Sequence, residues 1–212
     1  MATVEKAGAR RAPVQERSRR RVEAILDAAE RLVVDRGVEA LTTREIAVAA
    51  GVPVASLYQY FADKEAVLLA LAERDMAEMD EQVAVDLAAL AESDDLTVAS
   101  LVETAVRAFV KVYARRRACV EIYLRGRTNT AVHAFGREHN VRVARALRAL
   151  ALEYGLARPE LSEQAAVLAV EVGDRVFQLA YEHDHRGDAA LVEEGIVLMT
   201  AYLERYAAGP AR

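Results

Sequence analysis

The 212-residue sequence contains one cysteine, Cys119, and no tryptophan. A single thiol excludes an internal disulfide framework and suits a reducing compartment, although the nearby run Arg115 to Arg117 leaves a redox role open beside a structural one. No stretch approaches 18 consecutive uncharged apolar residues, and no apolar run of the kind found in secretory signals follows the basic N-terminus. We therefore expect a soluble, cytoplasmic protein that does not act on a membrane.

Signatures of the common enzyme classes are also missing. The sequence has no phosphate-binding glycine-rich loop, no nucleophile elbow and no zinc-protease helix motif. The four histidines, His133, His139, His183 and His185, have no recognised metal-ligand spacing, and the last two fit a cluster at a helix C-terminus better than a metal site. We expect no catalytic residues, no metal and no cofactor.

Residues that interrupt helices are scarce, with four prolines and ten glycines. Alanine, leucine, glutamate and arginine dominate, no alternating strand pattern is sustained, and apolar residues recur at helical spacing. The sequence predicts an all-α fold. Breaks at glycine, proline and polar clusters place the helices at about 16–36, 42–51, 53–61, 63–90, 97–117, 119–125, 129–154, 160–184 and 188–206.

The net charge of −5 is unevenly distributed. Residues 1–64 hold 11 basic and 9 acidic residues, whereas residues 65–212 hold 17 and 24. Seven of the basic residues lie within residues 1–21, and residues 1–15 are expected to form a basic flexible arm. Such asymmetry suggests that the N-terminal end meets a polyanion while the remainder keeps the molecule soluble.

The second and third predicted helices have the spacing of a helix-turn-helix. Thr42 and Glu45 fit a capping box at the start of the first, and Gly51 supplies the turn. The third helix should expose short, amidic or phenolic groups that suit base edges and the thymine methyl. Tyrosines at helical spacing also occur as half-buried core, and helix-turn-helix units also serve protein contacts, so this pattern alone leaves both alternatives open.

The surrounding sequence decides between them. The stretch from 28 to 68, with Leu-Thr-Thr-Arg-Glu-Ile-Ala at 41–47, Ala-Gly-Val at 50–52 and Leu-Tyr-Gln-Tyr-Phe-Ala-Asp-Lys-Glu at 57–65, resembles the TetR family of transcription regulators without a gap. Pro53 departs from the pattern, because a serine or threonine cap often stands there. The small pair Val54-Ala55 leaves few groups for reading the base sequence.

The resemblance implies a homodimeric repressor that binds a pseudo-palindromic operator on double-stranded DNA and is released by a small-molecule effector. It implies a three-helix DNA-binding domain at 16–64 and a helical-bundle effector-binding and dimerisation domain at 65–212. The residues expected to contact DNA are Thr42, Thr43, Arg44, Val54, Ala55, Ser56, Tyr58, Gln59, Tyr60 and Lys64.

For the second domain the resemblance implies a ligand cavity and a dimer interface on the last two long helices. We expect an apolar or amphipathic effector among Phe109, Tyr113, Glu121, Tyr123, Asp174 and Phe177, with Arg175 as a further ionisable candidate. The expected interface residues are Val170, Gly173, Val176, Ile196, Met199 and Leu203. The competing interpretations are an enzyme with an apolar cavity and an interaction module that does not bind DNA; salt-sensitive binding to duplex DNA separates them from the repressor.

Overall fold

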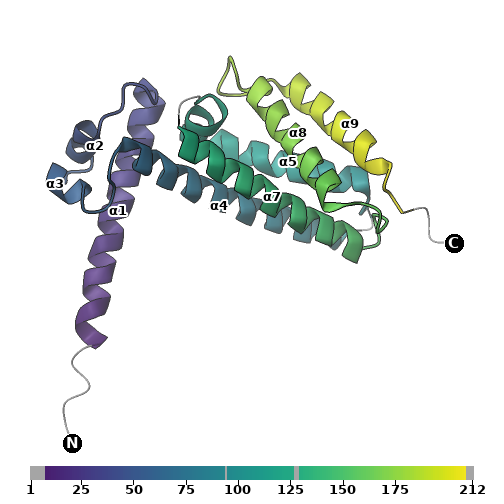
Figure 1. The fold of residues 1–212 in the computed structure, drawn as a ribbon, viewed down its shortest axis with the longest axis horizontal. Helices are drawn as coiled ribbons and strands as arrows, with labels where there is room; N and C mark the ends of the chain where they lie inside the picture. Colours follow the sequence, from purple (N-terminus) through teal and green to yellow (C-terminus); the bar gives the residue numbers. More distant parts are fainter. Residues whose placement is uncertain (1–7, 94, 127–128, 209–212) are drawn as a thin grey trace, which may run out of the picture. The chain divides into compact units, whose positions relative to one another are not determined.

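The computed structural model describes residues 8–93, 95–126 and 129–208, and the chain divides into two compact units, residues 1–71 and 72–212. The predicted all-α fold is confirmed, since the named elements of the described residues are all helical (Figure 1). They are α1 (Gly8–Arg36), α2 (Thr43–Ala49), α3 (Val54–Leu57), α4 (Lys64–Ala91), α5 (Val98–Arg115), α6 (Arg117–Cys119), η1 (Val120–Leu124), α7 (Thr130–Glu153), α8 (Glu163–Ala180) and α9 (Ala189–Glu204).

The first helix is longer than the sequence predicted. It begins at Gly8 and not at Glu16, so the part of the expected flexible arm from residue 8 onward is helical, and residues 1–7 of that arm lie outside the described residues. Alanine and arginine dominate residues 8–12, and both favour helix, which accounts for the extension. The helix ends as expected, because Gly37 has a φ of 78° and its N–H donates to the carbonyl of Val33 at 2.9 Å.

The first unit encloses a small apolar interior between α1, α2, α3 and the beginning of α4. The helices are fixed to one another by side chains that are almost fully buried, and an ion pair of 3.1 Å between Arg36 and Glu45 joins α1 to α2. The buried side chains include Ile25, Leu26, Ala29, Val33, Ile46, Ala47, Leu57, Phe61, Val67 and Leu68.

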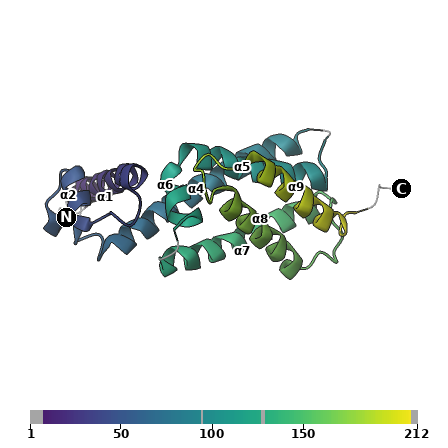
Figure 2. The same ribbon diagram turned by 90° about the horizontal axis from the view of Figure 1, so that it is seen from above.

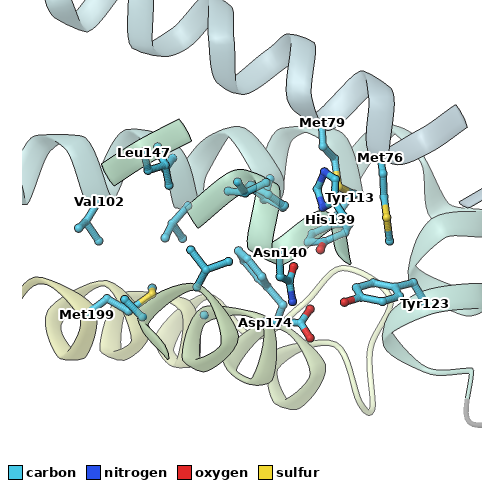
Figure 3. Close-up of a pocket in the computed structure, with 18 of the residues that line it drawn as sticks. Met76, Met79, Val102, Tyr113, Tyr123, His139, Asn140, Leu147, Asp174 and Met199 are labelled. Atoms are coloured by element: carbon cyan, nitrogen blue, oxygen red, sulfur yellow. The ribbon is translucent and has the colours of Figure 1, made fainter. Parts of the chain in front are cut away.

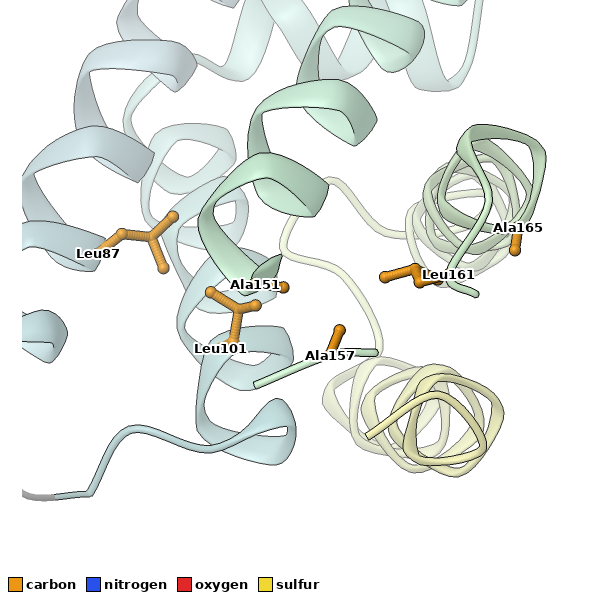
Figure 4. Packing of buried hydrophobic residues seen from close by; sticks show 6 residues of the cluster. All are labelled: Leu87, Leu101, Ala151, Ala157, Leu161 and Ala165. Carbon is orange, nitrogen blue, oxygen red and sulfur yellow. The ribbon is translucent and has the colours of Figure 1, made fainter. Parts of the chain in front are cut away.

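The second unit consists of the remainder of α4 and helices α5 to α9. Helix α8 lies between α7 and α9, and α9 also packs on α5 (Figure 2). At the end of the unit where α5 and α8 begin, the connection after α7 is held by a small apolar cluster (Figure 4). Its buried members are Leu87, Leu101, Ala151, Ala157, Leu161 and Ala165.

Two predicted boundaries of the second unit are corrected by the structure. The helix expected at 119–125 consists of the short α6 followed by the π-helical η1, in which the Arg125 N–H donates to the Val120 carbonyl five residues earlier, at 2.9 Å. The helix expected at 160–184 is shorter, because Ser162 caps its N-terminus and residues 181–188 form turns. His183 and His185 therefore lie in a turn beyond α8 and not in its last helical turn. Among the described helices, none combines the length and the hydropathy needed to cross a bilayer.

Candidate functional site

The turn between α2 and α3 is built by hydrogen bonds that the sequence anticipates. Thr42 caps α2 by accepting from the Glu45 N–H at 3.2 Å. The Glu45 carboxylate accepts from the Thr42 hydroxyl at 2.8 Å and from Arg36, which replaces the expected reciprocal bond to the Thr42 backbone. At the other end Gly51 has a φ of 66°, and the N–H groups of Gly51 and Val52 donate to the carbonyls of Val48 and Ala47. This pair of bonds ends α2 and turns the chain into α3.

Helix α3 ends at Leu57 and not at residue 61 as predicted, and Tyr58, Gln59 and Tyr60 follow it in a turn. Residues 54–60 present one buried and several exposed side chains. Leu57 is fully buried against α2, whereas Ala55, Tyr58 and Gln59 are exposed, Tyr58 by 52%. Three further residues are half-buried: Val54, Ser56 and Tyr60. Pro53 precedes the helix as its N-cap without a side-chain hydrogen bond, as its sequence implies. The exposed surface of α3 and the turn after it, residues 54–60, is therefore uncharged and carries methyl, hydroxyl, amide and phenol groups.

The two tyrosine hydroxyls of this surface are held by hydroxyl partners on neighbouring helices. The Tyr58 hydroxyl lies 3.0 Å from Thr43 Oγ1 on α2, and Ser18 Oγ on α1 donates to the Tyr60 hydroxyl at 3.3 Å. The bond from Ser18 lowers the pKa of Tyr60 from its ordinary value. These contacts fix where both phenols lie while leaving Tyr58 open to solvent.

Basic side chains lie near the same helices. Lys64 begins α4 directly after Asp63, whose carboxylate accepts from the Ala66 N–H at 2.8 Å. Arg44 on α2 is exposed, as are Arg17 and Arg21 on α1. A half-exposed ammonium group beside a helix N-terminus makes a favourable position for a phosphate.

A second candidate site lies inside the unit of residues 72–212. It is a cavity of about 80 Å³ between α4, α5, η1, α7, α8 and α9. Figure 3 shows its polar groups together at one end, with Val102, Leu147 and Met199 toward the other. Its lining residues are Met76, Met79, Val102, Ala105, Val106, Phe109, Tyr113, Tyr123, His139, Asn140, Val143, Leu147, Ala169, Val170, Gly173, Asp174, Phe177, Met199 and Leu203.

The polar end is organised around Asp174 on α8. Its carboxylate accepts from Gln178 Nε2 at 2.9 Å and from the side chains of Tyr123 and Asn140. Asn140 also donates to the Glu171 carboxylate at 3.3 Å. Burial raises the pKa of Asp174, and the charge of Glu171 adds to the shift. Burial likewise raises the pKa of Tyr123, so this phenol stays protonated.

Glycine makes room for one of these groups. A Cβ at Gly136 on α7 would lie 2.2 Å from Cε2 of Tyr123, so a larger residue there would collide with the ring. Nearby, His139 is buried, and its Nε2 lies 2.8 Å from Asp80 Oδ1 on α4. The polar end of the cavity is thus assembled from η1, α7 and α8, with α4 joined to it through His139.

Five of the six residues expected around a ligand lie around this one cavity. Glu121 does not, because it turns toward Arg125, whose guanidinium donates to it at 2.6 Å. Arg175 is exposed and donates to Gln178 at 3.0 Å. Sequence reasoning missed Met76, Met79, His139 and Asn140; the only available signal was a methionine pair at helical spacing and two adjacent polar residues in α7.

The residues expected at the dimer interface are buried or half-buried within the single chain. Val170, Gly173, Met199 and Leu203 line the cavity, and a Cβ at Gly173 would lie 2.9 Å from the Met199 sulfur. Val176 is half-buried and lies against Gly195, where an added Cβ would be 2.5 Å from it, and Ile196 is also half-buried. The small residues of α8 and α9 serve close packing between these two helices within one chain. The exposed apolar side chains of the pair are different ones: Leu168, Leu179, Leu191, Val197 and Leu198.

The possible metal ligands and the single cysteine of the described residues are the other candidates for a reactive site. The described residues include no group of three or more His, Cys, Asp or Glu side chains that could hold a metal ion. Cys119 is fully buried in α6, and burial raises the pKa of its thiol well above the ordinary value. Its position fits the structural role more closely than the redox role, since reactive thiols are exposed and have a lowered pKa.

Comparison with known families gives two matches that together span most of the chain. Residues 25–71 match the family described as bacterial regulatory proteins, tetR family, and residues 97–203 match the tetracyclin repressor-like C-terminal domain. An uncharacterised HTH-type transcriptional regulator of Mycobacterium tuberculosis is 36% identical over 80 residues. That alignment covers 38% of this chain and 40% of the relative.

Solved structures show a similar fold over most of the chain. A TetR-family transcriptional regulator from Streptomyces coelicolor is 28% identical, with a TM-score of 0.67 over 88% of this chain and 99% of that one. The fatty acid degradation regulator FadR from Bacillus halodurans is 22% identical, with a TM-score of 0.65 over 84% and 94% of the two chains. Because the Bacillus halodurans protein is only 22% identical, its similarity supports a shared fold and nothing further.

Proposed function

The chain belongs to the TetR family of DNA-binding transcriptional regulators, and from this premise we propose that it is a ligand-responsive repressor that binds operator DNA as a homodimer in the cytoplasm. The family and the matched relatives are regulators and not enzymes, so the enzyme alternative is set aside. In the proposal residues 16–64 bind DNA, and residues 65–212 bind the effector and dimerise. The observation that carries it is the uncharged, exposed surface of α3, fixed in place by hydroxyl contacts to α1 and α2.

In the proposed complex α3 lies in the major groove. Val54, Ala55, Ser56 and Gln59 would face base edges, because their small and amidic groups match the donors, acceptors and methyl groups found there. The remaining residues would reach the phosphates or the backbone, since hydroxyl groups, cations and helix N-termini supply such contacts. These are Thr42, Thr43, Arg44, Tyr58, Tyr60 and Lys64.

The outer face of α8 and α9 is the proposed dimer interface. On α9 the exposed or half-exposed residues Leu191, Leu198 and Ala201 recur at helical spacing, and on α8 so do Leu168 and Leu179. Exposed apolar patches on a helix pair mark interaction sites, and a second copy of the chain is the occupant that the family favours. The residues expected from the sequence, Val170, Gly173, Val176, Ile196, Met199 and Leu203, lie on the same two helices.

The interior cavity is the proposed effector site. Met76 and Met79 of α4 line it, and α4 contributes residues 64–71 to the first unit and 72–91 to the second. A ligand with different affinity for two positions of α4 would therefore change the affinity for DNA. An apolar cavity with a polar end suits an amphipathic ligand.

Selection of bound duplexes from a random DNA pool tests the proposal. The full chain should enrich a pseudo-palindrome, because one recognition helix covers too few base pairs to specify a site in a genome and two heads on a dimer are required. The two half-sites should lie about 34–36 Å apart, or a multiple of this. Enrichment of no sequence, or of single half-sites only, would contradict the proposed dimeric operator complex.

A further inference from the structure

The charge at the polar end of the cavity has one sign. Asp174 lines the cavity, and Glu171 lies one turn earlier on α8 and shares Asn140 with it. The neutral groups around Asp174 are Tyr123, Asn140 and Gln178, which donate hydrogen bonds to it. Among the described residues the structure gives Asp174 no ion pair with lysine or arginine. The cavity therefore ends at a carboxylate whose charge is stabilised by hydrogen bonds alone.

The cations nearest in sequence are committed elsewhere. Arg175, which follows Asp174, is exposed and donates to Gln178. Arg125, which follows η1, pairs with Glu121 outside the cavity lining. His139 lies at the polar end but binds Asp80 of α4 at 2.8 Å, so it brings a second carboxylate with it. Among the described residues that line this cavity there is no lysine or arginine that would receive an anionic ligand.

The aromatic and methionine side chains that line the cavity suit the apolar part of an organic cation. Phe177 is stacked on Phe109 with centroids 5.8 Å apart, and the Tyr113 ring meets Phe177 edge-on at 5.2 Å. Aromatic faces attract ammonium groups, most strongly where water is excluded. Three methionines, Met76, Met79 and Met199, complete the wall, and their unbranched side chains allow a small cavity to widen around a ligand.

A second cavity gives the ligand's apolar part somewhere to extend. It has a volume of about 60 Å³ and shares five lining residues with the first, at the end opposite Asp174. Its wall is aliphatic except for Arg148, whose Nε donates to the Leu161 carbonyl at 2.7 Å. The shared residues are Val102, Leu147, Ala169, Val170 and Leu203. A hydrocarbon chain that starts at Asp174 and passes Leu147 would enter this second space.

We propose that the cavity binds an amphipathic amine, with its ammonium group at the Asp174 carboxylate and its hydrocarbon part along the aromatic and methionine wall toward Leu147. The inference rests on the proposed function, in which this cavity is the effector site. Burial and the neighbouring charge of Glu171 raise the pKa of Asp174, and a bound cation would oppose both effects by favouring the ionised carboxylate. A carboxylate ligand would add a third negative group at the same end.

Three probes of one chain length test the ligand class on the intact protein: octylammonium, octanoate and 1-octanol, each below its micellar concentration. Octylammonium should raise the melting temperature, 1-octanol should raise it less, and octanoate should leave it unchanged. A larger shift with octanoate than with octylammonium would overturn the proposal, as would the absence of a shift with octylammonium.

Paired variants assign the effect to the carboxylate. Asp174→Asn should weaken octylammonium binding about 10- to 100-fold, the range expected for a lost charge-assisted hydrogen bond, with 1-octanol binding retained. Glu121→Gln is the matched control, because it removes an equal charge outside the cavity lining, and it should bind octylammonium as the unmodified chain does. Equal affinities of Asp174→Asn and the control would overturn the assignment.

DNA titrations on the same samples distinguish a failure of this inference from a failure of the proposed function on which it rests. If octanoate binds and releases DNA, the effector cavity stands and the amine class is wrong. If octylammonium binds as expected but leaves DNA affinity unchanged, the amine class stands and the proposed ligand response is wrong.

Discussion

The polar groups of the helix-turn-helix unit face the surface, whereas those of the C-terminal cavity face the interior of their unit. In the first, polar partners from residues 42–60 face the surface, as in Thr42 with Glu45 and Thr43 with Tyr58, while Ser18 of α1 is the partner of Tyr60. In the second, Tyr123, Asn140 and Asp174 come from three separate elements and meet in the interior. An outward site built from adjacent residues leaves a local pattern in the sequence, whereas an inward site exists only after the helices have packed.

The same residue type acquires different properties in the two regions. Tyr58 is 52% exposed and hydrogen-bonded at one edge, which leaves its phenol accessible to a partner. Tyr113 is 1% exposed, and burial raises its pKa well above the ordinary value. Tyrosines at helical spacing are therefore not informative by themselves; their burial decides between a contact group and a wall of the interior.

The largest expected effect concerns the outer face of the C-terminal unit. Leu198→Glu should raise the dimer dissociation constant at least about 100-fold, roughly 3 kcal/mol, because a two-fold interface would bury the introduced charge twice. Sedimentation should then show monomers that have lost operator binding while α1 to α3 remain folded. Val85→Glu on α4 is the control, since Val85 is 64% exposed and lies outside the proposed interface. A dimer that survives Leu198→Glu places the interface elsewhere.

The second largest expected effect is on the free energy of unfolding, and it concerns the packing at the polar end of the cavity. Gly136→Ala should destabilise the protein by about 1–3 kcal/mol, because the added Cβ would lie 2.2 Å from the buried Tyr123 ring. At an unhindered helical position this substitution would stabilise by about 0.5–1 kcal/mol, so the sign of the change is diagnostic. Denaturant unfolding measures it. In the Tyr123→Ala background the penalty should vanish; an equal penalty there would show that the ring is not its cause.

A substitution at Tyr58, in the turn after α3, should change the affinity for DNA and not the stability of the protein. Tyr58→Ala should weaken operator binding by about 1–3 kcal/mol, because the phenol is an exposed contact, and should change the free energy of unfolding by less than about 0.5 kcal/mol. Tyr154→Ala is a suitable control, since Tyr154 is 47% exposed in the second unit. Unfolding of the Tyr58 variant would instead assign that side chain to the interior packing of its unit.

The smallest expected effect is electrostatic. Lys64→Ala should lower the affinity for all DNA sequences alike and reduce the slope of log affinity against log salt by about one, because one phosphate contact is lost. Lys111→Ala should leave the slope unchanged, since Lys111 pairs with Asp86 in the second unit. Identical slopes for the two variants would remove Lys64 from the DNA contacts.

Sequence reasoning found the features that depend on neighbouring residues. The Thr42 cap, the turns at Gly37 and Gly51 and the burial of Leu57 follow from local geometry and spacing, and each is present. It placed the start of α1 too late, because residues 4–15 contain no Ser, Thr, Asp or Asn that would signal a helix start in the sequence.

The second unit was less predictable because contacts between distant segments decide it. Glu121 and Asp174 both look like carboxylates within apolar runs, yet only Asp174 faces the cavity, since Arg125 holds Glu121 outside it. Gly173 and Met199 suggested an interface between chains but pack against each other within one. Helical spacing shows which residues share a face of α8, and it does not say which helix covers that face.

Equilibrium binding of the full chain to the selected operator, measured over a series of salt concentrations with the stoichiometry determined by sedimentation, tests the central claim most directly. The account predicts dimers that bind the pseudo-palindrome, with an affinity that falls steeply with salt and far more weakly on a duplex carrying one half-site. Binding that is insensitive to salt, or a monomer that binds the palindrome tightly, would contradict it.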